Sequence, residues 1–450
     1  MIRRLICTLA VLACLAQPEA ARADTELALS AEAALTAGQI EMARIFALAA
    51  LEQNPKDAKA LAVLAAVGLA TKEPEAARIV AAQSFRAASD DLGKFTAARL
   101  AARASVDAGE NGVAKYWLRR AIQVAPTDST RAMVIRDFSV LRGKAPLRLD
   151  VDLSVKPSDN VNQGARDTML VIDGQPTWFY FDGSTRALSG VEASASLHLR
   201  YRLAGTVAEP TEIGLRLYHR GVMLSDEAEA LAPTASGSDF SNSSIDATLY
   251  RTMMLSPKQA LRAGVTLGRN YLAGEAYSDR ARFDATLTTG HGENTRSRIG
   301  FAVERQWLES GRPHATVYAL DLGLEQRLQS GDTVALRLDG GTTVSDDANQ
   351  ENRRLGASLR YALGKPVAGA KLSGSLTVIG RDYPVFFNGI FNDTGRQDVT
   401  FASSLEIAMP KLGAFGFEPV LSIEASRTRS NISRYESENL GIGLRIQSSF

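Results

Sequence analysis

Period-two alternation of apolar and polar residues constrains the fold of this 450-residue chain more than any other feature. From Val191 to Leu203 every odd-numbered residue is apolar and every even-numbered residue is polar. Such a segment predicts a β-strand that is long enough to cross a bilayer, with one face for lipid and one for water. Segments 261–268, 318–325 and 355–363 follow the same rule.

Fourteen strands of this kind are expected between residues 147 and 450. Their centres lie near residues 151, 197, 217, 249, 266, 284, 302, 322, 337, 358, 375, 402, 422 and 443. A soluble sandwich turns about every 8–12 residues, whereas these strands recur about every 22 residues. An even number of long antiparallel strands predicts a closed transmembrane barrel of the bacterial type.

The connections between the predicted strands differ in length at the two ends of the barrel. Short ones, such as 256–259, 330–332 and 365–368, follow even-numbered strands, and the long ones, 156–187, 225–242, 382–396 and 427–438, all follow odd-numbered strands. Membrane barrels have short periplasmic turns and long external loops. We therefore expect an outer-membrane barrel with both ends of its chain, and any domain before it, in the periplasm.

Residues 24–146 predict a separate helical domain, rich in Ala and poor in Gly. Gly38, Ala43, Ala50 and Pro55 recur 71 residues later as Gly109, Ala114, Ala121 and Pro126. A middle copy fits around Ala77, although Ser84 and Ser89 replace the expected Ala and Pro, and residues 92–94 look inserted. This pattern resembles the tetratricopeptide repeat, with segment 129–141 as a terminal cap. The simpler alternative is an Ala-rich bundle without repeats.

Tetratricopeptide repeats present a concave groove to a polypeptide rather than an active site. In the repeat register this groove would carry Lys59, Arg99 and Arg103, which makes them candidate client-binding residues. The alternative is that each is an ordinary solvated surface charge.

The first 23 residues are expected to be a signal peptide. Arg3 and Arg4 precede a short apolar stretch, and Ala21 and Ala23 provide the small residues of a cleavage site. A lipobox ending at Cys14 is the competing interpretation. The chain contains two Cys, both within this segment, so the mature protein is expected to have no thiol.

The residues of the mature chain do not suggest an enzyme. Its four His are widely separated, no metal-ligand spacing is present, and neither a phosphate-binding glycine loop nor a nucleophile elbow occurs. We therefore expect no catalytic residues, no metal and no cofactor. The formal net charge of +1 gives no electrostatic reason to expect nucleic acid as a partner.

The chain ends on a predicted strand whose last residue is Phe450. A terminal aromatic on such a strand resembles the signal read by the machinery that inserts outer-membrane barrels. That machinery and outer-membrane lipid are therefore expected partners.

Short motifs near the beginning and the end of the barrel sequence resemble those of a known family. Residues 155–162, Val-Lys-Pro-Ser-Asp-Asn-Val-Asn, resemble its turn after the first strand, and segments 416–421 and 427–432 resemble its last hairpin. The family is the surface lipoprotein assembly modifiers, which join tetratricopeptide repeats to a fourteen-stranded barrel. The resemblance implies a translocator that delivers a client lipoprotein or secreted protein to the cell surface.

In that turn, Asn160 and Asn162 have two interpretations. The first is structural, since Asn tolerates the left-handed conformation of tight loops. The second is contact with the client. Two other functions also remain open for the whole chain: a polysaccharide-export protein, and a diffusion porin or receptor with a periplasmic helical domain.

Overall fold

The computed structural model describes residues 17–387, 391–392, 394–413 and 417–448. The chain divides into two compact units that join between Ala145 and Pro146. The first unit is helical, and the second is a closed antiparallel barrel of fourteen strands. The predicted fold class, a short tetratricopeptide-like solenoid followed by a fourteen-stranded barrel, is therefore confirmed.

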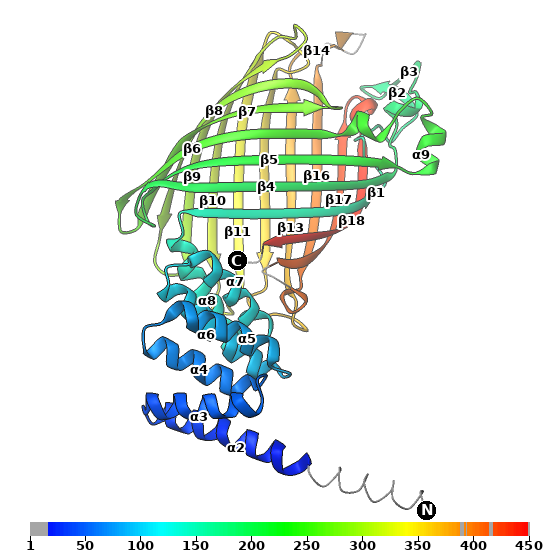
Figure 1. The fold of residues 1–450 in the computed structure, drawn as a ribbon. Helices are drawn as coiled ribbons and strands as arrows, with labels where there is room; N and C mark the ends of the chain where they lie inside the picture. The colour runs from blue at the N-terminus through cyan, green and yellow to red at the C-terminus, as the bar shows by residue number, and fades with distance from the viewer. Residues whose placement is uncertain (1–16, 388–390, 393, 414–416, 449–450) are drawn as a thin grey trace, which may run out of the picture. The chain divides into compact units, whose positions relative to one another are not determined.

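Seven helices of the described residues make up the first unit, coloured blue to cyan in Figure 1. They are α2 (Gln17–Thr36), α3 (Ile40–Gln53), α4 (Ala58–Ala70), α5 (Pro74–Ala87), α6 (Asp91–Asp107), α7 (Asn111–Gln123) and α8 (Asp128–Lys144). Three antiparallel hairpins, α2–α3, α4–α5 and α6–α7, pack in sequence, and α8 packs on α7. None of the described helices is both long enough and apolar enough to span a membrane.

The turn inside each hairpin contains one residue in the left-handed conformation. These residues are Gly38 (φ 75°), Lys72 (φ 63°) and Gly109 (φ 78°). In all three turns the next N–H donates to a carbonyl five residues earlier, at 2.9, 2.7 and 2.8 Å respectively, which closes the end of the first helix. The middle repeat therefore has the same turn as the others. The sequence pattern does not show this turn, because Lys72 replaces the glycine found in the other two.

The two helices of each hairpin cross at small, fully buried residues. Ala43, Ala77 and Ala114 occupy one crossing position, and Ala50, Ser84 and Ala121 occupy the other. The Ser84 hydroxyl is satisfied because it donates to the Ala58 carbonyl oxygen at 2.7 Å. Residues 92–94, which look inserted in the sequence, lie in the first turn of α6, so the longer repeat lengthens a helix rather than a loop.

The barrel strands are neighbours in chain order, and the last pairs with the first to close the sheet (Figure 1). They are β1 (Leu147–Ser158), β4 (Gly190–Gly205), β5 (Pro210–Leu224), β6 (Asn242–Ser256), β7 (Gln259–Leu272), β8 (Glu275–Gly290), β9 (Thr295–Leu308), β10 (Ala315–Arg327), β11 (Thr333–Ser345), β12 (Asn352–Ala362), β13 (Lys371–Tyr383), β16 (Arg396–Ala408), β17 (Phe417–Ser430) and β18 (Ser437–Ser448). Every predicted strand centre falls inside one of them.

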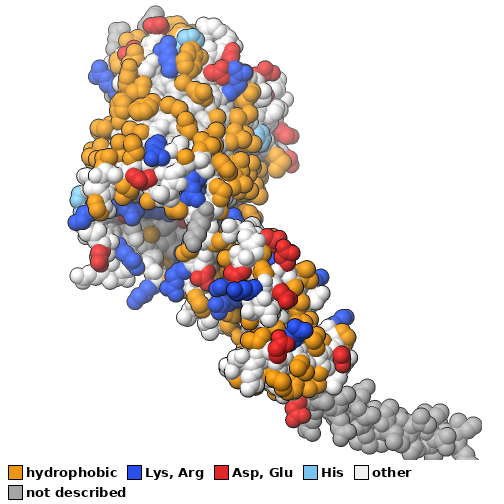
Figure 2. All heavy atoms as spheres, turned by 60° about the vertical axis from the view of Figure 1, so that its left-hand side comes forward, with side chains coloured by type: hydrophobic (Ala, Val, Ile, Leu, Met, Phe, Trp, Pro, Cys, Tyr) orange, Lys and Arg blue, Asp and Glu red, His pale blue; other side chains and the backbone are white. Residues whose placement is uncertain are grey.

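The outward face of the barrel is apolar. Exposed large hydrophobic residues alternate along the strands, for example Leu320, Leu322 and Leu324 on β10. Figure 2 shows one side of this wall, on which hydrophobic side chains predominate. Outward charges such as Arg269 and Arg427 lie near strand ends, where a bilayer gives way to polar headgroups. This distribution matches a wall in contact with lipid.

The longest connections contain structure of their own. The first holds a hairpin of β2 (Met169–Ile172) and β3 (Gln175–Tyr180) and a 3-10 turn η1 (Gly183–Thr185). The second holds α9 (Asp226–Leu231) and η2 (Gly237–Phe240), and the third holds β14 (Phe386–Phe387) and β15 (Phe391–Asn392). A further 3-10 turn, η3 (Pro410–Leu412), lies on a short connection.

The predicted loop at 427–438 is shorter than expected. Residues 427–430 still belong to β17, and the connection spans only 431–436, with the 3-10 turn η4 (Ser433–Tyr435). The outward charges Arg427 and Arg429 break the apolar pattern, but the backbone ladder continues past them to β16 and β18.

Candidate functional site

The first helices of the hairpins form a continuous face, because α2 contacts α4 and α4 contacts α6. The predicted groove residues lie on two of these helices, Lys59 on α4 and both Arg99 and Arg103 on α6. All three are exposed. Leu92 and Val106 lie on the same exposed stripe of α6, 61% and 43% exposed. The face therefore combines cationic and apolar groups.

The three basic residues do not form a single cluster. Lys59 lies near Asp90, the N-cap of α6; a hydrogen bond from the Gly93 N–H lowers the pKa of Asp90, and Lys59 adds to the effect. Arg103 lies about 20 Å further along α6, at a rise of about 1.5 Å per residue. Arg103 forms an ion pair with Asp107 at 2.9 Å, and Arg99 lies 5.7 Å from the Phe95 ring centroid.

Asn160 and Asn162 brace the start of the first long connection. The buried Asn160 amide donates to the carbonyl oxygens of Gly164 and Glu438, both at 3.1 Å, and accepts from the Gly164 N–H at 2.8 Å. Asn162 donates to the Arg186 oxygen at 2.7 Å and accepts from the Leu188 N–H at 2.9 Å. The left-handed residue of this turn is Gln163, so hydrogen bonding rather than backbone conformation explains the two Asn.

Two small hydrophobic clusters join the long connections to one another at one rim of the barrel. The first combines the first, third and last long connections through Ala165, Leu170, Phe181, Tyr383, Phe386 and Ile432. The second joins the first and second connections through Val161, Leu188, Val222, Ala228 and Ala232. The Arg396 guanidinium lies 3.3 Å from the Tyr435 ring centroid and pairs with Asp398 at 2.6 Å. These connections form an ordered layer rather than independent loops.

The inward face of the barrel is polar, and its basic residues outnumber its acidic ones. The inward basic residues are Arg148, Lys156, Arg200, Arg202, Arg216, Arg220, Arg262, Arg280, Arg282, Arg296, Arg298, Arg327, Arg337, Arg354, Arg360, Lys371, Arg381, Arg396 and Arg445. The inward acidic residues are Asp150, Asp152, Glu192, Glu212, Asp246, Asp284, Glu304, Asp321, Glu325, Asp339, Asp398, Glu406, Glu418 and Glu424.

Nine of the fourteen described inward carboxylates form an ion pair with an inward arginine, on the same strand or on one of the next two strands. Asp321 bridges Arg298, at 2.8 Å, and Arg337, while Asp339 pairs with Arg354. Other pairs are Arg200–Asp150, Arg220–Glu192 and Arg280–Asp246, at 2.6, 2.9 and 2.6 Å. These ion pairs therefore fix the positions of the arginine side chains along the inner wall.

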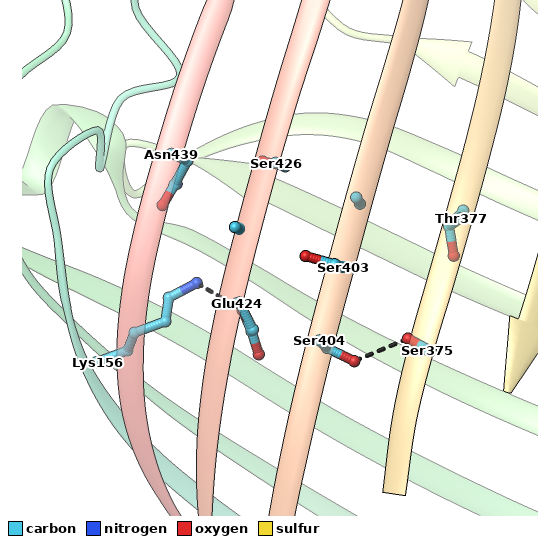
Figure 3. A pocket seen from close by; sticks show the side chains of 10 residues that line it. Lys156, Ser375, Thr377, Ser403, Ser404, Glu424, Ser426 and Asn439 are labelled. Atoms are coloured by element: carbon cyan, nitrogen blue, oxygen red, sulfur yellow. Dashed lines mark hydrogen bonds and ion pairs between the residues drawn. The ribbon is translucent and has the colours of Figure 1, made fainter. Parts of the chain in front are cut away.

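A different lining occurs near the seam where β1 meets β18. The cavity in Figure 3 is lined mainly by small polar side chains, including the hydrogen-bonded pair Ser375 and Ser404 at 2.8 Å. The Lys156 ammonium, from β1, reaches Glu424 on β17 at 3.2 Å (Figure 3). Its stem crosses Gly441 and Gly443 of β18, where a Cβ would lie within 3.0 and 3.4 Å of Lys156 carbons.

This Lys156 contact was missed by the sequence analysis. The sequence pattern assigns Lys156 to the long connection 156–187, whereas β1 continues to Ser158 and carries Lys156 on its inward face. Lys156 and Glu424 are 268 residues apart and meet only through the closure of the barrel. Of the remaining predicted residues, Ala21 and Ala23 fall in the first turns of α2, where the backbone alone is described, and Phe450 lies outside the described residues.

A closed barrel with an apolar outer wall and a polar lining, joined to a tetratricopeptide-like helical unit, defines a two-part outer-membrane protein. No protein-family model matches the chain. No curated protein matches it significantly.

Several solved structures are similar to parts of the chain. OmpTΔL8, a loop-deletion mutant of an outer membrane protein of Vibrio cholerae, is 9% identical over 67% of this chain and 98% of that chain, with a TM-score of 0.36. The Arabidopsis OM64 TPR domain is 19% identical over 27% and 97%, with a TM-score of 0.24. A bacterial polysaccharide outer membrane secretin is 8% identical over 67% and 98%, with a TM-score of 0.33. Likenesses of this size carry no information on function.

Proposed function

We propose that this protein is an outer-membrane translocator that delivers a client lipoprotein or secreted protein from the periplasm to the cell surface. The supporting observation is the direct joining of an exposed, mixed cationic and apolar helical face to a polar-lined barrel. Only Ala145 and Pro146 separate the end of α8 from the start of β1. This is the arrangement that the resemblance to the surface lipoprotein assembly modifiers implies.

The orientation is part of the same proposal. The helical unit enters β1 at its first residue, Leu147, and the longest connection follows the other end of this strand. Because membrane barrels have short periplasmic turns and long external loops, the helical unit lies in the periplasm, where exported clients arrive. The ordered layer of long connections then faces the outside of the cell.

The proposed activity is transport without catalysis. Inward carboxylates such as Asp246 and Asp321 are held in ion pairs with arginine, at 2.6 and 2.8 Å, rather than arranged as an acid and base pair. The proposed partners are the client, the barrel-insertion machinery that reads Phe450, and outer-membrane lipid.

Removal of residues 24–143 tests the division of labour. The barrel keeps a closed backbone ladder without the helices, so it should still assemble in the membrane. Surface-biotinylated proteins of intact cells are compared among strains with the full chain, the truncated chain and no chain, at matched barrel abundance. A protein that is displayed only with the full chain supports the proposal. Unchanged display with the truncated chain contradicts a capture role for the helices.

Charge reversal on the helical face tests the candidate groove. Arg99→Glu with Arg103→Glu should reduce display of the client several-fold. Arg119 and Arg120 are unsuitable controls, because their guanidinium groups lie 5.3 and 4.9 Å from the Phe138 and Phe85 rings and help to pack α7.

A matched control changes Arg44 on α3 and Arg86 on α5 to Glu, since both are exposed on second helices. Equal loss of display in the two double variants contradicts a specific groove. A strain without the chain that loses an exported polysaccharide, but no surface protein, favours the polysaccharide-export alternative.

A further inference from the structure

One cavity of the inner wall differs from its surroundings in how its charges are paired. It has a volume of about 350 Å³ and lies over strands β4 to β9. Five arginines line it, Arg200, Arg216, Arg262, Arg280 and Arg282, together with His198. The cavity belongs to the barrel alone, so it does not depend on the placement of the helical unit.

Three of these arginines are held by carboxylates. Arg200 pairs with Asp150 at 2.6 Å, Arg280 with Asp246 at 2.6 Å, and Arg282 with Glu304 at 3.6 Å. Arg216 and Arg262 are different, because no carboxylate of the described residues lies within salt-bridge distance of either. Both are exposed to the lumen, so their N–H groups are accessible to a solute.

The position of Arg262 is fixed by a ring rather than by an ion pair. Its guanidinium carbon lies 3.6 Å from the Tyr250 ring centroid, and the Tyr250 hydroxyl donates to Asp284 at 2.7 Å. A Cβ on Gly264 would lie 2.4 Å from the Tyr250 ring, so glycine is needed for this ring to lie along the wall. The stack covers one face of the guanidinium and leaves its edge available for hydrogen bonds.

The neighbouring strand positions are arranged in the same way. A Cβ on Gly268 would lie 2.1 Å from the Asp246 carboxylate. Because glycine has no Cβ, the carboxylate can lie along the wall and pair with Arg280. Asp246 is almost fully buried and already paired. The charge of Arg280 is thus compensated by Asp246, whereas the charges of Arg216 and Arg262 are available to a bound solute.

We propose that this cavity is a binding site for an oxyanion, a carboxylate or phosphate group, with Arg216 and Arg262 as its ligands. A guanidinium binds either group through charge-assisted, often bidentate hydrogen bonds. Glu212 also lines the cavity and carries no ion pair among the described residues, so it competes electrostatically with the ligand. The site does not rest on the proposed translocator function.

Calorimetric titration of the purified full-length chain in detergent tests the site. The two probes are a hexaglutamate peptide and tripolyphosphate, which present the carboxylate and the phosphate form of the ligand. Arg216→Gln or Arg262→Gln should weaken binding of the preferred probe by about tenfold, the cost of one charge-assisted contact. Glu212→Gln should strengthen it about threefold, since it removes a competing charge.

Arg381→Gln is the matched control, because Arg381 also faces the lumen but lies on β13, outside this cavity. It should leave binding within about twofold of the unaltered protein. Heat-modifiable migration on gels establishes that each variant retains a folded barrel.

The outcomes separate the source of the ligand from the existence of the site. Preference for hexaglutamate supports an acidic polypeptide, and preference for tripolyphosphate supports a phosphate-bearing solute; both support the site. If neither probe binds, the proposed site is overturned. Equal weakening by Arg381→Gln also overturns it, because the effect is then one of total lumen charge. Surface display of a client is measured separately, so its loss does not affect this result.

Discussion

At the scale of single residues, one turn of the helical unit is strained. Lys72 adopts φ 63° where the equivalent residues of the other two hairpins are Gly38 and Gly109. A left-handed conformation costs a residue with a Cβ roughly 1–2 kcal/mol. Lys72 is exposed, so its side chain provides little packing in return.

Lys72→Gly should therefore stabilise the helical unit by about 0.5–1 kcal/mol, since relief of the strain exceeds the extra entropy of a glycine. Gly38→Ala should destabilise it by about 1 kcal/mol. Thermal loss of ellipticity at 222 nm in the detergent-solubilised full chain measures both. Gly112→Ala in α7 is the control, because no atom would contact its Cβ and alanine favours a helix. A lower melting temperature for Lys72→Gly would show that the turn is unstrained.

The sequence pattern predicts on which face of a strand a residue lies better than it predicts which residues its side chain contacts. Periodicity identifies the faces that carry Glu424, Arg216 and Arg262, because alternation depends only on neighbours in the chain. It does not give their contacts, which depend on register between strands and on closure of the barrel. The same limit applies to Asn160, whose amide donates to the Glu438 carbonyl oxygen, 278 residues away along the chain.

At the scale of elements, strand cores can be predicted more reliably than strand ends. Each of the fourteen expected centres lies in a strand because the apolar and polar faces differ most at mid-membrane. The end of β17 is missed because Arg427 and Arg429 lie beyond the apolar band while their backbone still pairs. For helices, the small residues Ala43, Ala77 and Ala114 identify the crossings, whereas Lys72 conceals a turn.

The seam between β1 and β18 is interrupted at one point. Val155 pairs with Leu444 and Ser158 with Gly441, but Lys156 and Pro157 between them have no paired residue on β18 among the described residues. Proline provides no N–H for a ladder. The Lys156 side chain passes over this stretch to Glu424, so a side-chain contact bridges three strands where the backbone contact is weakest.

Lys156→Met should lower the stability of the barrel, because it keeps the stem over β18 and removes the ion pairs with Glu424 at 3.2 Å and with Glu192 at 4.0 Å. Glu424 is 48% exposed, so solvent limits the loss to about 0.5–1 kcal/mol, or about 2 °C in the midpoint of heat denaturation on gels. Arg269→Met, which removes a pair with Asp279 inside one hairpin, is the control and should shift the midpoint less. A midpoint for Lys156→Met at or above that of the control contradicts a role at the seam.

At the scale of the whole molecule, the two rims of the barrel have different structures. The long connections share two buried clusters, one of which holds Phe386 and Ile432 from distant segments. The connections at the other rim, such as the one between β10 and β11, are short and contain no such cluster among the described residues. This asymmetry distinguishes the two rims of the barrel, and the sequence predicts the same distinction from the lengths of the connections.

Single thiols measure the orientation of the barrel in living cells, because both Cys of the chain, Cys7 and Cys14, lie in the predicted signal peptide. Glu229→Cys places an exposed thiol on α9 in the second long connection, and Gln329→Cys places one between β10 and β11 at the opposite rim. A membrane-impermeant maleimide should label Glu229→Cys on intact cells and Gln329→Cys only after the outer membrane is permeabilised. The unaltered chain, whose two Cys both precede the predicted cleavage site, should remain unlabelled under both conditions. Labelling of Gln329→Cys on intact cells, with protection of Glu229→Cys, would reverse the orientation and place the helical unit outside the cell, where it has no access to a periplasmic client.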